Sequence, residues 1–164
     1  LFNYGEGNTI NFEKLNGVVG VFGKNYSGKS SVIDSALYTI YNSISKNNRK
    51  NLNIINQNKQ SGCGRVEIDI DGKAYIIERK SEKYKKKLHG EETDEAKTDV
   101  EFSMIDPATG EETSMNSLDR NGTDKAIRKI FGSIDDFLLT SMSSQMGAMT
   151  NYRVRHYLRA SKRN

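Results

Sequence analysis

Residues 18–31 read VVGVFGKNYSGKSS and carry more information about the architecture than any other stretch of the chain. The apolar run 18–22 is typical of a buried strand, and it leads directly into glycines at positions 23 and 28. From Lys29 onward apolar residues recur every three or four positions, which predicts a helix. These positions are Val32, Ile33, Ala36, Leu37, Ile40 and Tyr41. A strand, a glycine-rich loop and a helix in this order predict a phosphate-binding loop.

The loop 23–31 fits the pattern GxxxxGK[ST], in which main-chain amides and the positive end of a helix dipole hold an anion. Lys29 is placed to bind the β and γ phosphates of ATP, Ser30 to ligate Mg²⁺ and Ser31 to bind the α phosphate. ATP and Mg²⁺ are therefore the predicted cofactors, and Lys29 is a predicted catalytic residue. The other predicted nucleotide-binding residues are Gly23, Asn25, Tyr26, Ser27 and Gly28.

The motif does not name the reaction, because transporters, kinases, GTPases, helicases and repair ATPases share it. In such ATPases an acidic residue at the end of a second buried strand normally holds the metal, and no apolar run of four ends in Asp or Glu here. Asp69 and Asp71 adjoin a tight turn and are expected to face solvent. We therefore expect this chain alone to be catalytically incomplete. It begins at Leu1 rather than Met, which indicates an excerpt of a larger protein.

The remaining sequence predicts a mixed α/β domain over residues 1–150. Residues 9–12 predict a further strand, and residues 42–64 a mobile connection anchored at 52–55. Alternating polarity within 65–115 predicts two antiparallel hairpins, separated by an exposed polar loop at 81–98. Helices are predicted within 123–142, the first of them over 123–131 and the second capped by Ser133.

Composition excludes several classes of protein. The net charge of +4 and the isoelectric point near 9.1 favour a polyanionic partner. Cys63, His89 and His156 are isolated, so a disulfide, a zinc site and thiol catalysis are not expected, and Cys63 is interpreted as a small loop residue. Without a secretion signal or an apolar run of about 20 residues, the chain is expected to be soluble, cytoplasmic and free of membrane.

The sequence resembles the amino-terminal lobe of the SbcC and SMC-like ATPases of DNA double-strand break repair, particularly the phage recombination-endonuclease large subunits. The resemblance runs from Leu1 to about Gly147 and rests on the order and spacing of its pieces. These pieces are Tyr4-Gly5-Glu6, residues 9–12, the loop 23–31, the helix 32–38, Ile55-Asn56, Val66, Gly72, Tyr75, Ile77, Arg79 and residues 136–145. It departs at Tyr26, where many relatives have glycine; a positive φ there would cost tyrosine on the order of 1 kcal/mol.

The resemblance implies a P-loop NTPase fold of the ABC type, a half head with an added antiparallel sheet. It implies that Gln145 lies in a Q-loop at 143–147 and contacts both Mg²⁺ and the γ phosphate, as a metal ligand and catalytic residue. The missing acidic strand and the ABC signature would lie in the protein's own carboxy-terminal lobe, beyond a long coiled coil. Residues 151–164 would begin that coiled coil or form a non-native tail. Two such heads would then sandwich two nucleotides.

The implied partners are a second copy of the chain, an SbcD-type nuclease and double-stranded DNA, in the nucleoid of a bacterial or phage-infected cell. Lys83, Lys85, Lys86 and Lys87 are the candidates for DNA phosphate contacts, in a basic stretch that also holds Lys80 and Tyr84. A solvated charge run is the alternative, because Glu82 and the acids from Glu91 onward weaken its field. Any cutting would come from the nuclease partner.

The predicted function is ATP-gated processing of DNA ends. One alternative is the nucleotide-binding domain of an ABC transporter; such heads usually stack an aromatic on adenine ahead of the loop, and Tyr4 is the only well-placed aromatic. The other alternative is a small-molecule P-loop kinase. A kinase would turn over its substrate as an isolated chain and would need a lid of arginines. The sequence shows no such lid.

Overall fold

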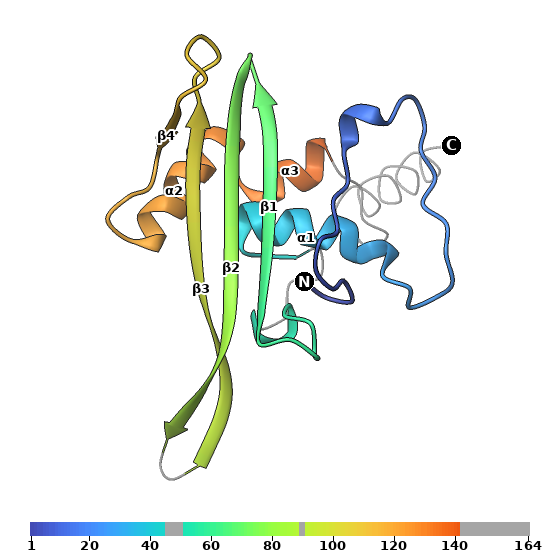
Figure 1. Ribbon diagram of the computed structural model, residues 1–164, viewed down its shortest axis with the longest axis vertical. Helices are drawn as coiled ribbons and strands as arrows, with labels where there is room; N and C mark the ends of the chain where they lie inside the picture. Colours follow the sequence, from blue (N-terminus) through green and yellow to red (C-terminus); the bar gives the residue numbers. More distant parts are fainter. Residues whose placement is uncertain (45–50, 89–90, 142–164) are drawn as a thin grey trace, which may run out of the picture.

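The computed structural model describes residues 1–44, 51–88 and 91–141, which form an antiparallel sheet with helices on one face (Figure 1). Gln145, the proposed Q-loop 143–147 and the tail 151–164 lie outside the described residues. The elements are η1 (Phe12–Lys14), α1 (Lys29–Tyr41), η2 (Asn51–Asn53), β1 (Ser61–Ile70), β2 (Lys73–Leu88), β3 (Glu91–Ile105), β4 (Glu112–Ser114), α2 (Arg120–Phe131) and α3 (Ile134–Thr140). The mixture of helices and strands is consistent with the predicted α/β class.

The sheet has the strand order β1-β2-β3-β4, and each neighbouring pair is antiparallel. The turn predicted between β1 and β2 is present, with φ of 53° at Asp71 and 76° at Gly72. Both values are positive, as a two-residue hairpin turn of this kind requires. Asp69 also stabilises the turn, since its carboxylate accepts a hydrogen bond from the Gly72 amide at 3.1 Å.

The exposed loop predicted at 81–98 is wrong, because β2 and β3 pair along their whole length, from Ala74↔Ile105 to Leu88↔Glu91. β1 ends its pairing at Glu82, so the rest of β2 and β3 continues as a two-stranded ribbon beyond it (Figure 1). The ribbon lacks the apolar alternation of a half-buried strand. Cross-strand ion pairs replace it, such as Lys86 with Glu95 at 3.3 Å.

The main core lies between one face of the sheet and the three helices. Ile77 and its cross-strand partner Phe102 are almost fully buried and point to the helix-covered face of the sheet. Around them pack the residues Leu37, Ile40, Tyr41 and Ile127, with Val66, Ile68, Tyr75, Val100 and Phe131 at the margin. The helix α1 that follows the glycine loop thus buries its carboxyl half, whereas its first turn is half-buried, with Ser30 exposed.

Arg79 is an exception to the apolar core. Its side chain has no exposed surface, and its guanidinium donates to Thr39 O at 2.9 Å and Ile40 O at 3.3 Å, near the carboxyl end of α1. It also forms an ion pair of 2.6 Å with Asp124 of α2. A cation beside the last carbonyls of a helix is stabilising, so Arg79 ties α1, β2 and α2 together.

The two carboxy-terminal helices follow their predicted signals. α2 begins at Arg120, three residues before the predicted start, because the Asp119 carboxylate caps the Gly122 amide at 2.7 Å. It ends at Phe131, and its C-cap Gly132 has a φ of 76°. Ser133 then forms the predicted capping box with Asp136 at the start of α3.

The strands predicted at 9–12 and 18–22 are absent among the described residues. Residues 12–14 form a 3-10 turn instead, and the apolar run before the loop is open to solvent, with Phe22 94% exposed. A buried strand requires neighbouring strands to pair its amides and cover its side chains. The described residues supply none here, so the run keeps an apolar sequence without strand geometry.

Candidate functional site

The glycine loop carries its curvature at two residues with positive φ, Tyr26 at 64° and Gly28 at 92°. Glycine adopts this conformation freely, whereas tyrosine pays a steric cost of about 1–2 kcal/mol. Tyr26 stands where many relatives have glycine, and it does adopt the positive φ that is unfavourable for tyrosine. The Tyr26 side chain itself is 98% exposed, so only its backbone contributes to the shape of the loop.

Lys29 closes the loop from inside. Its ammonium donates to Gly23 O at 2.8 Å and to Lys24 O at 2.7 Å, while the Ser27 amide bonds to Lys24 O at 3.2 Å. An ammonium has three donors, so the third is available to a ligand in the same cradle. The arrangement concentrates one positive charge where the backbone curls around it.

The first turn of α1 provides the remaining donors. Gly28 is its N-cap and supplies no side-chain acceptor, and no acidic residue occupies the first turn. The amides at the start of a helix have no carbonyl one turn earlier, so those of Lys29 and Ser30 suit the binding of an anion. Ser30 is exposed beside them, and the Ser31 amide bonds Gly28 O at 2.9 Å. These residues fit a polyphosphate with a magnesium ion.

Gly23 lies close to Ser27. A Cβ there would lie 2.8 Å from Ser27 Oγ, a contact that rotation of the serine side chain would relieve. The structure therefore brings Gly23, Ser27, Gly28 and Lys29 together in one loop. Asn25 lies in the same exposed curve.

The sequence did not reveal two contacts that reach the loop from the amino-terminal segment. Asn3 Nδ2 donates to Tyr26 O at 3.2 Å, and Tyr4 OH donates to Gly28 O at 3.0 Å. The bonded residues are 23 and 24 positions apart in the chain. The sequence singled out Tyr4 only as an aromatic that could stack on adenine. In the structure its hydroxyl hydrogen-bonds the loop.

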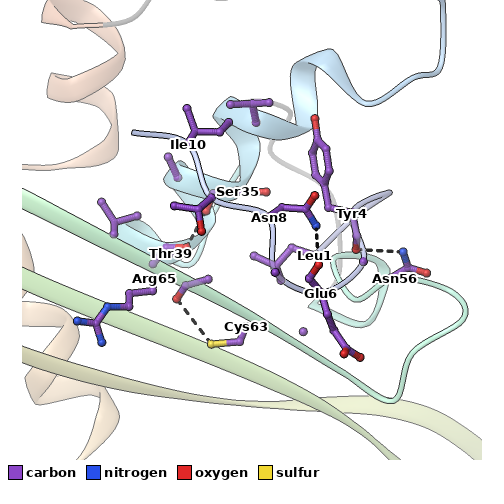
Figure 2. A pocket seen from close by; sticks show the side chains of 18 of the residues that line it. Leu1, Tyr4, Glu6, Asn8, Ile10, Ser35, Thr39, Asn56, Cys63 and Arg65 are labelled. Atoms are coloured by element: carbon purple, nitrogen blue, oxygen red, sulfur yellow. Dashed lines mark hydrogen bonds between the residues drawn. The ribbon is translucent and has the colours of Figure 1, made fainter. Parts of the chain in front are cut away.

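A cavity of about 820 Å³ lies beside this segment, between α1 and β1 (Figure 2). Tyr4, Ser35 and Thr39 line one side, and Cys63 and Arg65 lie on β1 at the other. None of residues 23–31 lines it. The cavity is thus a neighbour of the phosphate loop and not the loop's own cradle.

The candidate DNA-contacting lysines lie on the ribbon strand β2, not on a loop. Lys85 and Lys87 pair with Glu92 at 3.5 and 3.1 Å, and Lys86 pairs with Glu95. Lys83 donates to Asn56 O and Gln57 O at 3.2 and 3.3 Å. These contacts put a carboxylate beside each of Lys85, Lys86 and Lys87 and lower the positive potential around them.

Cys63 lies in β1 and not in a loop, because the strand begins at Ser61, earlier than its apolar alternation indicates. The residue is exposed, but loss of hydration around its thiol and the nearby Glu78 carboxylate raise the pKa of Cys63 to about 11. A raised pKa keeps the thiol protonated at neutral pH. Since the thiolate is the nucleophile, this environment disfavours a catalytic role.

We predict that Cys63 reacts with iodoacetamide at pH 8 more than about tenfold more slowly than free cysteine, because so little thiolate is present. The rate is measured by mass spectrometry of the intact chain. Glu78→Gln should speed the reaction by removing the negative neighbour, whereas Glu67→Gln on the same strand should not. A wild-type rate equal to that of free cysteine contradicts the prediction.

Metal clusters and membrane helices are both absent from residues 1–44, 51–88 and 91–141. No group of three or more His, Cys, Asp or Glu side chains in these ranges is arranged to hold a metal ion. In the same ranges, no helix has the length and apolarity needed to cross a membrane.

Comparison with known proteins gives the family of this chain. The family model described as "AAA domain" matches residues 2–155. An uncharacterized protein of Acanthamoeba polyphaga mimivirus is 32% identical over 148 residues, which are 87% of this chain and 10% of that protein. The SbcC component of the nuclease SbcCD of Clostridium acetobutylicum is 30% identical over 142 residues, which are 83% of this chain and 11% of that protein.

The DNA double-strand break repair Rad50 ATPase of Sulfolobus acidocaldarius is 34% identical over 74 residues, which are 45% of this chain and 8% of that protein. The chain thus spans about a tenth of the length of these relatives. The family match covers nearly the whole chain, and the named relatives agree with the resemblance that its motifs carry. The chain therefore belongs to the AAA domain family and is of the type of the amino-terminal ATPase lobe of SbcC/SMC-like proteins.

Proposed function

We propose that this chain binds Mg·ATP as one lobe of an ABC-type ATPase head that gates a partner nuclease at double-strand DNA ends. The observation that carries the proposal is the loop itself, with positive φ at Tyr26 and Gly28 around the Lys29 ammonium. The similarity to an SbcCD component and a Rad50 ATPase supports the repair context. The names of these two relatives are those of a nuclease component and a break-repair ATPase.

In this proposal each loop residue has one task. The amides of Gly28, Lys29 and Ser30 and the Lys29 ammonium hold the β and γ phosphates, and Ser31 holds the α phosphate. The Ser30 hydroxyl and the Gln145 amide oxygen would ligate Mg²⁺, which supplies charge neutralisation at the phosphates when bound. Gly23, Asn25, Tyr26 and Ser27 shape the cradle.

The exposed apolar run before the loop supports a second lobe. Val18, Val21 and Phe22 are among the most exposed large apolar side chains of the described residues. Apolar side chains in a row are normally covered, and strands from a carboxy-terminal lobe would pair with this run and bury it. The proposal therefore assigns residues 1–150 to the amino-terminal lobe and 151–164 to the start of a coiled coil or a tail.

The proposal is tested by measuring nucleotide binding and turnover by the chain with and without the complementary carboxy-terminal lobe. The chain alone should bind Mg·ATP weakly and hydrolyse almost none, because the proposal puts the acidic strand that holds the metal and the ABC signature in the second lobe. Adding the second lobe should restore hydrolysis. Brisk turnover by the chain alone would favour the kinase alternative and contradict the proposal.

DNA contact by the ribbon lysines is a separate part of the proposal. Changing Lys85, Lys86 and Lys87 together to Gln should weaken binding to duplex DNA and flatten its salt dependence. The slope of log K against log salt should fall by about 0.9 for each lysine that contacts a phosphate. Lys97→Gln is the matched control, since Lys97 also lies on the hairpin and pairs with Asp99 at 3.2 Å.

An unchanged slope in the triple variant would mean that these lysines serve only their cross-strand carboxylates. The ribbon would then be a solvated charge run, and DNA binding would have to use another surface. Binding is measured by fluorescence anisotropy of a labelled duplex over a range of salt concentrations.

A further inference from the structure

We infer that Asn3 and Tyr4 are positioning residues for the phosphate loop, an inference that rests on the proposed function. Asn3 donates to the carbonyl of Tyr26, and the Tyr4 hydroxyl donates to the carbonyl of Gly28. The two acceptors are the two loop residues with positive φ. The two hydrogen bonds are therefore made to the loop residues that have the left-handed backbone conformation.

Both side chains also lie close to Gly28. A Cβ built on Gly28 would lie 3.6 Å from Asn3 Cβ and 3.6 Å from Tyr4 Cζ, so a side chain there would meet both residues. The two side chains thus border the same stretch of the loop that they hydrogen-bond. We call the pair Asn3 and Tyr4 the clasp.

The clasp is anchored on its other side. The Phe2 amide donates to Ile54 O at 2.7 Å, and Asn56 Nδ2 donates to Tyr4 O at 3.2 Å (Figure 2). Phe2 is buried in a small core with Tyr38 and Ile54. Because the segment is bound to the body of the domain at Phe2 and Tyr4, its side chains can hold the loop against movement.

The effect on phosphate binding follows from peptide geometry. In a trans peptide the C=O and the next N–H point in opposite directions. Holding Gly28 O toward Tyr4 therefore directs the Lys29 amide away from it, and holding Tyr26 O toward Asn3 fixes the peptide unit before Ser27. A loop already in its binding conformation loses less freedom when the ligand arrives.

This role differs from stacking of the Tyr4 ring on adenine. Stacking depends on the ring, whereas the clasp depends on the hydroxyl. Tyr4→Phe keeps the ring and removes the hydroxyl, so it separates the two. Inorganic tripolyphosphate also distinguishes the two roles, because it has phosphates for the loop to bind but no base for the Tyr4 ring to stack on.

The test is calorimetric titration of wild type, Tyr4→Phe and Asn3→Ala with Mg·ATP and with magnesium tripolyphosphate. Each variant should bind both probes about fivefold more weakly, the scale of one lost hydrogen bond. Tyr41→Phe is the matched control, because it removes a hydroxyl that also donates to a main-chain carbonyl, Phe131 O at 3.2 Å, remote from the loop. Its affinities should equal those of wild type.

A double variant tests the link to backbone strain. In a Tyr26→Gly background, Asn3→Ala should cost less than about twofold, because glycine adopts positive φ without support. Equal losses in the two backgrounds would mean that Asn3 only stabilises the domain. Melting curves set a temperature at which every variant is folded, so the cycle remains decisive if Tyr4→Phe is unstable.

The possible failures are distinguishable. If wild type binds neither probe, the proposed nucleotide function is wrong. If wild type binds both and Tyr4→Phe binds both equally well, the function stands and the clasp is wrong. A loss with Mg·ATP alone would place the Tyr4 hydroxyl at the base and also overturn the clasp.

Discussion

Lys29→Ala is expected to abolish measurable binding of Mg·ATP, a loss of more than about 100-fold. Its ammonium is the cation enclosed by the loop, held by Gly23 O and Lys24 O. A hydrogen bond to a charged group contributes about 1.5–3 kcal/mol, and this lysine has one donor left for a phosphate in addition to the attraction of its charge. The measurement is calorimetric titration at low ionic strength.

The control for this prediction is Lys73→Ala, which removes an exposed lysine from the first residue of β2. It should leave the affinity unchanged and so exclude a general effect of net charge. Retention of wild-type affinity by Lys29→Ala would show that the ammonium does not face the phosphates. The melting temperature of Lys29→Ala should remain close to that of wild type, because the side chain is held only by two exposed hydrogen bonds.

Asp124→Ala is expected to destabilise the fold by about 3–5 kcal/mol, because it leaves the buried guanidinium of Arg79 without its counterion. Arg79 has no exposed surface, and its Nη1 already lacks a hydrogen-bond partner among the described residues. The two carbonyls of α1 that it also contacts do not neutralise a full charge. The measurement is the free energy of unfolding in urea.

The control is Asp99→Ala, which breaks the exposed ion pair between Lys97 and Asp99 and should change stability by less than about 0.5 kcal/mol. If Asp124→Ala lowers the free energy of unfolding by no more than Asp99→Ala does, water must reach Arg79 when its ion pair is broken, and the prediction is wrong. The double change of Arg79 to Met and Asp124 to Leu should recover much of the loss, because it removes both charges from the core.

Local signals predicted much of this molecule. The loop 23–31, the helix that follows it and the turn at Asp71-Gly72 each depend on residues close together in sequence. The caps at Ser133 and Gly132 are of the same kind. Glycine positions and side-chain caps act within a few residues, so the chain itself carries the information.

Features that depend on distant partners were not predicted. Arginine is rarely fully buried, and the partner of Arg79 lies 45 residues away on α2. The ribbon looked like a loop because its strands are held by cross-strand charges, and charged residues are poor strand signals. The clasp joins residues 23 and 24 positions apart, and no local pattern announces it.

The run 18–22 failed as a strand for a related reason. Its composition is that of a buried strand, but burial is supplied by neighbours, and the described residues leave it open. Sequence pattern predicts what a segment is suited to, and only the assembled neighbours determine whether it is paired. The proposed second lobe supplies those neighbours.

Titration of the folded wild-type chain with Mg·ATP in a calorimeter tests the central claim most directly. The loop geometry predicts saturable heat from a single site, and the heat should disappear when tripolyphosphate already fills the loop. No heat from folded protein, at concentrations where weak binding is detectable, would contradict the claim that this loop holds a nucleotide.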